Sequence, residues 1–277
     1  MDGSHDALAE RAERALRRAV LYELQTGGGI ALAAPARGTS KADAGRALAA
    51  IGAAVDELRS YFPKAPARLA AMLGGEGQRV LDVGAGARPW SLAFAARHET
   101  LRLTAFDLPG EQPAVRAAIG AARVGDRYEI VSGNVFTDEF EDLGTFDVVI
   151  LANVCHVFDA RRTQLLLERV ARRVRAGGVL AIVDQVLETE PDWARWSALY
   201  AVGVLHIGPG GQLHSVDEYE RWVCAAGLRV TSVRALCPLP PLSALIARRP
   251  ATASESARAD RWHHQPLTGA SARTNSS

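Results

Sequence analysis

Apolar residues between positions 78 and 249 fall into short runs that alternate with helical stripes. The short runs predict strands at Arg79–Val83, Leu101–Phe106, Tyr128–Val131, Phe146–Leu151, Val179–Asp184, Leu228–Arg234 and Ser243–Ala247. The stripes between them predict helices at Pro89–Arg97, Gln112–Ala122, Arg162–Arg175 and Val216–Ala226. The last helix begins with Ser215 and Glu218 at the spacing of a capping box. This alternation predicts an α/β fold with a doubly wound, mostly parallel sheet that binds its ligand at the carboxyl ends of the strands.

The N-terminal part of the chain shows only helical patterns. Helices are expected at Asp6–Gln25, Lys41–Tyr61 and Ala65–Leu73, and the glycines after Thr26 end the first of them. The last residues are rich in Ser, Ala, Thr and Arg, a composition that cannot build a core. We therefore expect an N-terminal helical region at 1–75, an α/β domain at 76–249 and a disordered tail at 250–277.

A glycine turn follows the first predicted strand. Asp82 stands two positions before Gly84, and Gly86 follows, so the backbone can approach a nucleotide-like ligand closely. The third glycine of a dinucleotide-binding fingerprint would stand at Pro89, and the Gly-Lys-Ser/Thr of a P-loop is absent. Asp107 closes the second predicted strand, where an acid can accept hydrogen bonds from both hydroxyls of a ribose.

Composition narrows the class of protein. The chain of 277 residues suits one or two domains, and its net charge of +1 gives no basic field for nucleic acid. No apolar run is long enough to span a membrane, and the first residues lack the pattern of a signal peptide. The three cysteines have no metal-like spacing, and no HxxxH or CxxC pair occurs, so we expect no metal. A reduced, cytoplasmic enzyme fits these features best.

Five stretches that follow one another in order are typical of one enzyme family. They are Leu81–Gly86, Phe106–Pro109, Ser132–Phe136, Phe146–His156 and Arg175–Leu180. Together they resemble the S-adenosylmethionine-dependent class I methyltransferases, and most closely the small-molecule O-methyltransferases of plant and bacterial secondary metabolism. The resemblance covers roughly Leu69 to Ala247 and implies a Rossmann-like sheet with a seventh, antiparallel strand. It also implies S-adenosylmethionine as methyl donor and S-adenosylhomocysteine as product.

The resemblance implies cofactor contacts along the strand ends. Asp82 would help to hold the amino-acid end of the cofactor, although a strand-end acid can instead orient the amides of the turn. Asn134 would accept a hydrogen bond from the adenine amino group. Val135 and Phe136 would pack about the adenine, although Phe136 could equally be a core residue. The expected cofactor-binding residues are Asp82, Gly84, Gly86, Asp107, Leu108, Asn134, Val135, Phe136 and Asn153.

His156 is the candidate catalytic base. A lone histidine after a strand is commonly structural, but this one lies at the ligand-binding edge, follows Asn153 and matches the catalytic base of the family. A neutral imidazole, with an ordinary pKa of about 6.5, can take a hydroxyl proton near neutral pH. Asp184, at the end of the fifth predicted strand, is the expected orienting carboxylate.

The acceptor pocket and two departures from the family pattern complete the prediction. Trp196, Tyr200 and His206 lie between the fifth and sixth strands, where relatives build the acceptor pocket, although aromatic residues at such spacing are commonly core. They would suit a flat, aromatic or polyketide-like acceptor. Arg88 stands where the family usually has glycine, and Leu213 stands where plant members carry a glutamate.

The leading interpretation is methyl transfer to a hydroxyl of a small natural product. Its first alternative keeps the cofactor and methylates carbon or nitrogen. Its second is a methyltransferase-like cyclase or binding protein that has lost methyl transfer. The N-terminal helices either pack against the domain or, as the resemblance implies, cover the substrate and form a homodimer. Neither nucleic acid nor a membrane is an expected partner.

Overall fold

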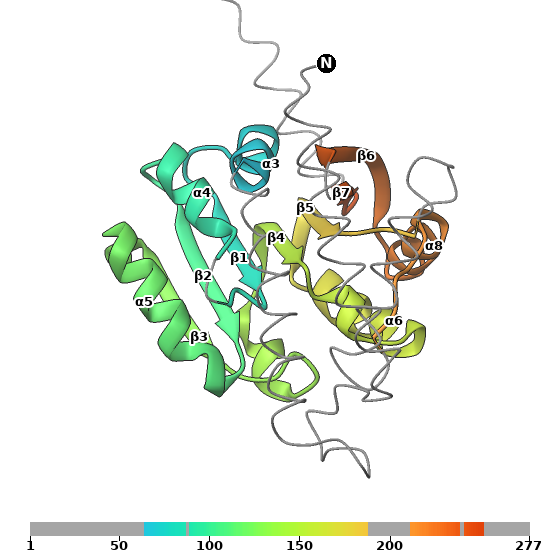
Figure 1. Ribbon diagram of the computed structural model, residues 1–277, viewed down its shortest axis with the longest axis horizontal. Coiled ribbons are helices and arrows are strands. Elements are labelled where there is room, and N and C mark those ends of the chain that lie inside the picture. Colours follow the sequence, from blue (N-terminus) through green and yellow to red (C-terminus); the bar gives the residue numbers. More distant parts are fainter. Residues whose placement is uncertain (1–63, 87–88, 188–210, 239–240, 252–277) are drawn as a thin grey trace, which may run out of the picture.

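A computed structural model of the chain describes residues 64–86, 89–187, 211–238 and 241–251, which build an α/β sheet structure (Figure 1). One sheet contains seven strands in the order β3-β2-β1-β4-β5-β7-β6. The strands are β1 (Arg79–Val83), β2 (Arg102–Asp107), β3 (Tyr128–Ser132), β4 (Phe146–Ala152), β5 (Val174–Asp184), β6 (Arg229–Pro238) and β7 (Pro241–Arg248). The α-helices are α3 (Ala65–Leu73), α4 (Ser91–Arg97), α5 (Gln112–Ala122), α6 (Ala160–Ala171) and α8 (Val216–Ala225). Short 3₁₀ helices include η1 (Pro109–Glu111), η2 (Gly125–Arg127), η3 (Asp138–Leu143) and η4 (Cys155–Val157).

The first five strands are parallel, and β7 runs antiparallel to both β5 and β6. Strand β1 pairs with β2 on one side and with β4 on the other, so the strand order reverses beside β1. Ligands of such sheets bind at this reversal, outside the carboxyl ends of the strands. The predicted Rossmann-like sheet, including its antiparallel seventh strand, is confirmed.

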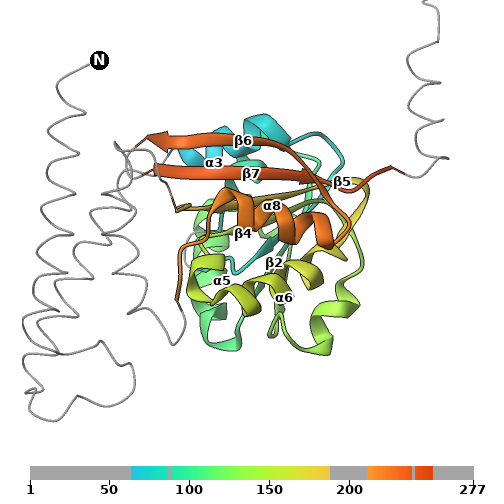
Figure 2. The ribbon, with the colours of Figure 1, turned by 90° about the vertical axis from the view of Figure 1, so that its right-hand side faces the viewer.

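Both faces of the sheet are buried, because neighbouring strand residues point alternately to two hydrophobic clusters. Leu81 and Val149 pack in a cluster with residues of α6 and α8, whereas Val80 and Val148 pack in a cluster with residues of α3 and α4. Helix α5 adds a small cluster with Ala105. Continuous apolar runs are typical of parallel strands covered on both sides. Figures 1 and 2 show the sheet between these two groups of helices.

The helices and strands predicted between residues 65 and 249 are present, and some of their limits differ. Helix α6 begins at Ala160, because the carboxylate of Asp159 accepts a hydrogen bond from the backbone N–H of Arg162 at 2.8 Å and caps the helix. The prediction of helix through residue 175 is wrong, because Val174 already pairs with Phe146 in β5. Helix α4 begins at Ser91, two residues later than predicted. The capping box at the start of α8 is confirmed, since the side chain of Ser215 and that of Glu218 each bond the other's backbone N–H.

Several predictions lie outside the described residues. These are the helices expected at Asp6–Gln25 and Lys41–Tyr61, the tail from residue 252, and the pocket residues Trp196, Tyr200 and His206. The helix expected at Ala65–Leu73 is described and has the predicted bounds. Within the described ranges, no helix is long and apolar enough to cross a membrane.

Candidate active site

Asp82 lies under the glycine turn that joins β1 to α4. Its side chain is buried, and Oδ2 accepts hydrogen bonds from the backbone N–H and the hydroxyl of Ser91 at 2.8 and 2.7 Å. Burial raises the pKa of Asp82 to about 6, and the hydrogen bonds from Ser91 oppose this increase. The carboxylate therefore orients the start of α4, which is one of the two roles expected for it. Its contact with a cofactor stays a prediction.

The two glycines of the turn differ in what surrounds them. Gly84 has a φ of 70°, and a Cβ added to it would lie 2.6 Å from Cγ2 of Val154, so the turn packs directly on the loop after β4. Gly86 has a φ of 57°, but a Cβ added there would meet no described atom within 4 Å. As far as the described residues show, nothing covers the backbone at Gly86, and a glycine at such a position lets a bound molecule approach closely.

Asp107 joins the turn to the end of β2. Its Oδ2 accepts the backbone N–H of Gly86 at 2.6 Å, and its Oδ1 accepts the N–H of Leu108 at 2.7 Å. Each carboxylate oxygen can accept a further hydrogen bond, so Asp107 can also bind hydroxyl groups. Leu108, next to it, is an exposed apolar side chain at the same edge of the sheet.

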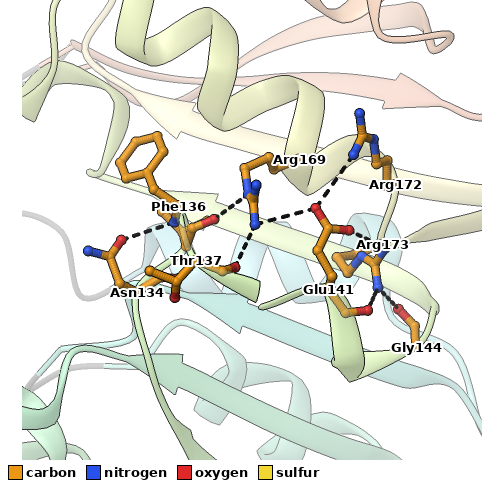
Figure 3. A network of polar contacts seen from close by, with 9 residues as sticks. Asn134, Phe136, Thr137, Glu141, Gly144, Arg169, Arg172 and Arg173 are labelled. Atoms are coloured by element: carbon orange, nitrogen blue, oxygen red, sulfur yellow. Dashed lines mark hydrogen bonds and ion pairs between the residues drawn. The ribbon is translucent and has the colours of Figure 1, made fainter. Parts of the chain in front are cut away.

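Hydrogen bonds from α6 hold the loop after β3. The Oδ1 atom of Asn134 accepts the N–H of Phe136 at 3.0 Å, which closes a local turn. The guanidinium of Arg169 donates to the carbonyls of Val135 and Thr137 at 2.7 and 2.5 Å. Glu141 contacts the guanidinium groups of Arg169, Arg172 and Arg173, as Figure 3 shows. The predicted adenine-binding residues are thus on a loop whose backbone is fixed by the helix.

The chain bends at Asn153, directly after β4. Its φ of 56° lies in the left-handed region, which asparagine adopts more readily than most residues with a side chain. Its backbone N–H donates to the carbonyl of Val183 at 2.8 Å. The side chain of Asn153 is exposed, while the next residue, Val154, packs against Gly84. The bend leads into η4, which carries His156.

His156 and Asp184 form a buried pair. Their side chains are 7% and 1% exposed, and Nδ1 of His156 lies 2.6 Å from Oδ1 of Asp184. The backbone N–H groups of His156 and Gln185 also donate to this carboxylate, at 3.2 and 2.9 Å. Burial lowers the pKa of His156. The charge of Asp184 and its hydrogen bond together raise the pKa by more than burial lowers it, so the pKa of His156 is above its ordinary value. The residues predicted as base and orienting carboxylate are therefore in direct contact.

The contact with Asp184 assigns the proton on the histidine ring. A carboxylate accepts hydrogen bonds, so Nδ1 carries a hydrogen and Nε2 is the basic nitrogen of the neutral ring. Histidine–carboxylate pairs of this kind fix the tautomer and orientation of a general base. The pair can therefore accept a proton at Nε2.

Some site residues were not predicted from the sequence. Ser91, Arg169, Thr163 and His214 each bond a segment that carries a predicted residue. His214 directly follows Leu213, the position at which plant members of the family carry a glutamate, and this neighbour was the available signal for it. Leu213 is buried, and Arg88 lies outside the described residues. In the described part of the chain, no three His, Cys, Asp or Glu side chains gather as a metal site.

The sequence of this chain matches one known protein family. The profile of the family described as "O-methyltransferase domain" matches residues 73–229, which include β1 to β5, the His156–Asp184 pair and α8. This chain belongs to that O-methyltransferase domain family.

Three relatives of this O-methyltransferase domain illustrate the similarity, and two of them are named for natural-product biosynthesis. The tetracenomycin polyketide synthesis 8-O-methyl transferase TcmO of Streptomyces glaucescens is 29% identical over 171 residues, which cover 61% of this chain and 49% of TcmO. An O-methyltransferase family protein from Burkholderia thailandensis has a similar structure, with a TM-score of 0.61 and 25% identity over 75% of this chain and 60% of its own. An O-methyltransferase from neocarzinostatin biosynthesis, NcsB1, shares the fold, with a TM-score of 0.58 and 22% identity over 87% of this chain and 70% of its own.

This chain spans about half the length of the curated relatives that it matches.

The His156–Asp184 pair of this O-methyltransferase domain predicts a specific pH behaviour. Because the folded-state pKa of His156 is raised, the pair stabilises the protein fully below the unfolded-state pKa of about 6.5. This stabilisation is lost as the pH rises through the folded-state pKa. In Asp184→Asn only the effect of burial remains, so we expect the pKa of His156 to fall below its ordinary value. Titration of the His156 ring by NMR measures this pKa in the wild-type protein and in Asp184→Asn.

Asp126→Asn is the matched control, because Asp126 is an exposed carboxylate of η2 on the loop before β3. It should leave the titration of His156 unchanged. Equal pKa values of His156 in wild type and folded Asp184→Asn would contradict the assigned pairing.

Proposed function

We propose that this protein is an S-adenosylmethionine-dependent methyltransferase that transfers a methyl group to a hydroxyl of a small natural-product acceptor. The observation that carries this proposal is the buried His156–Asp184 contact of 2.6 Å, one strand away from the glycine turn, in a chain of the O-methyltransferase domain family. The turn offers a backbone open to a cofactor, and the pair offers a base. The combination is what methyl transfer to a hydroxyl requires.

The residues at the carboxyl ends of β1, β2 and β3 fit S-adenosylmethionine. Gly86 leaves its backbone open, and Asp107 can accept hydrogen bonds from the ribose hydroxyls. Leu108, Val135 and Phe136 would contact the adenine, with Asn134 beside its amino group. Asp82 and Asn153 would lie near the amino-acid end. When bound, the cofactor supplies a methyl group on a positively charged sulfur. NcsB1 is described in complex with S-adenosylmethionine, which supports this choice.

His156 would act on the acceptor as general base. Its Nε2 would take the proton of the acceptor hydroxyl and keep it on the imidazole, so that the oxygen could receive the methyl group that the cofactor would supply, with S-adenosylhomocysteine as the other product. Asp184 would keep Nδ1 protonated before the transfer and stabilise the imidazolium after it. Since the reaction needs the neutral ring, the rate should increase with pH through the pKa of His156.

The acceptor is proposed to be aromatic or polyketide-like. TcmO is named for tetracenomycin polyketide synthesis, and the NcsB1 complex contains 2-hydroxy-5-methyl naphthoic acid. Trp196, Tyr200 and His206 remain the candidate acceptor-binding residues. The region 1–75 is proposed to cover the acceptor or to form a homodimer, the domain 76–249 to bind the cofactor, and 250–277 to be a tail.

Loss of the base should affect turnover and spare cofactor binding. His156→Ala removes the proton acceptor, so we expect turnover to fall by a factor of about 100 or more. The measurement is transfer of a labelled methyl group from S-adenosylmethionine to phenolic acceptors, with product analysis to show whether oxygen, carbon or nitrogen carries the label. His98→Ala serves as control, because His98 is a partly buried histidine at the end of α4 that contacts Glu76, and it should keep full turnover. Full turnover in His156→Ala would remove this residue from the mechanism.

Loss of the ribose acceptor should affect cofactor binding. Asp107→Ala deletes charge-assisted hydrogen bonds, so the dissociation constant for S-adenosylhomocysteine should increase about tenfold or more. Calorimetric titration measures this constant, and Asp126→Ala, which deletes an exposed carboxylate, is the control. An unchanged constant in Asp107→Ala would show that the ribose binds elsewhere.

A further inference from the structure

His214 is a fully buried histidine that the proposed reaction does not use directly. It lies just before Ser215, the residue that caps α8. Its Nε2 lies 3.2 Å from the carbonyl oxygen of Phe158 and 3.0 Å from Oγ1 of Thr163. A carbonyl can only accept, so Nε2 carries the hydrogen and donates to both oxygens. The hydroxyl of Thr163 then donates onward to the carbonyl of Cys155 at 3.2 Å.

Helix α8 fixes the orientation of this ring. His214 packs edge-to-face on Tyr219 and Trp222, with ring centroids 5.6 and 5.0 Å away. Its Nδ1 is buried and has no hydrogen-bond partner among the residues that the structure describes. Burial lowers the pKa of His214, so the ring is neutral and donates only from Nε2. The ring of His214 therefore packs against Tyr219 and Trp222, and its Nε2 bonds the segment beside it.

That segment is η4, which carries His156. The carbonyls bonded through His214 and Thr163 belong to Cys155, directly before the base, and to Phe158, two residues after it. The stretch that contains His214 also bonds the base and the exit of β5 through its backbone. Gln212 N–H donates to the carbonyl of His156 at 3.0 Å, and the carbonyl of His214 accepts from Leu187 N–H at 2.9 Å. One stretch therefore connects both halves of the catalytic pair.

We infer that His214 is a positioning residue, which holds η4 through Phe158 and Thr163 so that Nδ1 of His156 stays on Asp184. This inference rests on the proposed function for its consequence in catalysis, but the positioning itself can be measured without turnover. If η4 loosens, the contact between His156 and Asp184 weakens. The base would then lose part of the charge and hydrogen bond that raise its pKa, and the acceptor proton would be taken from a poorer geometry.

The other titratable groups around this site keep their charge state near neutral pH. Cys155 on η4 and Tyr219 on α8 have pKa values raised by burial, so both are neutral. Glu218 on α8 has a pKa lowered by the hydrogen bond from the backbone of Ser215, so it is ionised. Asp184 on β5 is the carboxylate in contact with His156. A change in the titration of His156 therefore reports a change in its contact with Asp184 or in its burial, and a lower pKa of His156 in a folded variant indicates a weaker contact with Asp184.

The test compares two substitutions of His214 that separate donor from shape. His214→Phe keeps an aromatic ring against Tyr219 and Trp222 and removes the hydrogen-bond donor. His214→Gln removes the ring and keeps an N–H donor at about the position of Nε2. We expect His214→Phe to lower the pKa of His156, measured by NMR, by about one unit. In turnover assays, kcat should fall about tenfold with the KM for the cofactor little changed. His214→Gln should recover most of both losses.

Thr163→Val is the second variant, because it removes only the hydroxyl from a fully buried site and conserves volume. It should lower the pKa of His156 as His214→Phe does. If His214→Phe does not fold, Thr163→Val alone tests the positioning role. An unchanged pKa of His156 in these folded variants overturns the inference, and so does a lower kcat without a pKa shift. If the wild-type protein transfers no methyl group, the proposed function fails, while the pKa measurement still tests the positioning.

Discussion

The contact between His156 and Asp184 is the interaction on which the rest of this site depends. A buried carboxylate is costly unless hydrogen bonds compensate for its lost hydration. Asp184 receives them from the ring and backbone of His156 and from the backbone of Gln185. The same bonds define the path of η4 and the exit of β5. Stability and chemistry are therefore coupled at this carboxylate, because a change that moves His156 also leaves a buried charge without its partner.

The same physical solution appears at three strand ends. Asp107 and Asp184 end parallel strands and Asp82 is one residue from the end of another, and each accepts a backbone N–H from a segment that follows or from a neighbouring turn. The loops that we propose to bind ligand are thus held in place by acids on the sheet. Helix α6 supports the arrangement from one side, since Arg169 bonds the loop after β3 and Thr163 bonds η4. Two loops that would contact opposite ends of a cofactor share this single helix.

The sequence was sufficient for the sheet, because strands buried on both faces leave continuous apolar runs that end in visible glycine and acidic residues. It was also sufficient to pair His156 with Asp184, because His156 follows β4, Asp184 ends the neighbouring strand β5, and both strands end at one edge of the sheet. The end of α6 was misjudged, because Val174 is compatible with helix and strand, and only its pairing with Phe146 decides for the strand. Long-range pairing of this kind has no local signature.

Supporting polar residues were the part that the sequence could not supply. Thr163 and His214 are 51 residues apart along the chain, and nothing in either neighbourhood indicates a hydrogen bond between them. Ser91 reads locally as the start of a helix, and its bonds to Asp82 follow only from the fold of the turn. Such contacts decide how firmly a catalytic group is held, so they matter for rate more than for fold class.

The most direct test is a crystal structure of the full chain with S-adenosylhomocysteine. The ligand should lie along the carboxyl ends of β1 and β2, with its ribose hydroxyls on Asp107, its backbone contacts at Gly86 and its sulfur directed toward His156. A ligand bound elsewhere on the sheet, or one at this edge whose sulfur points away from His156, would contradict the assignment of this edge as a methyl-transfer site.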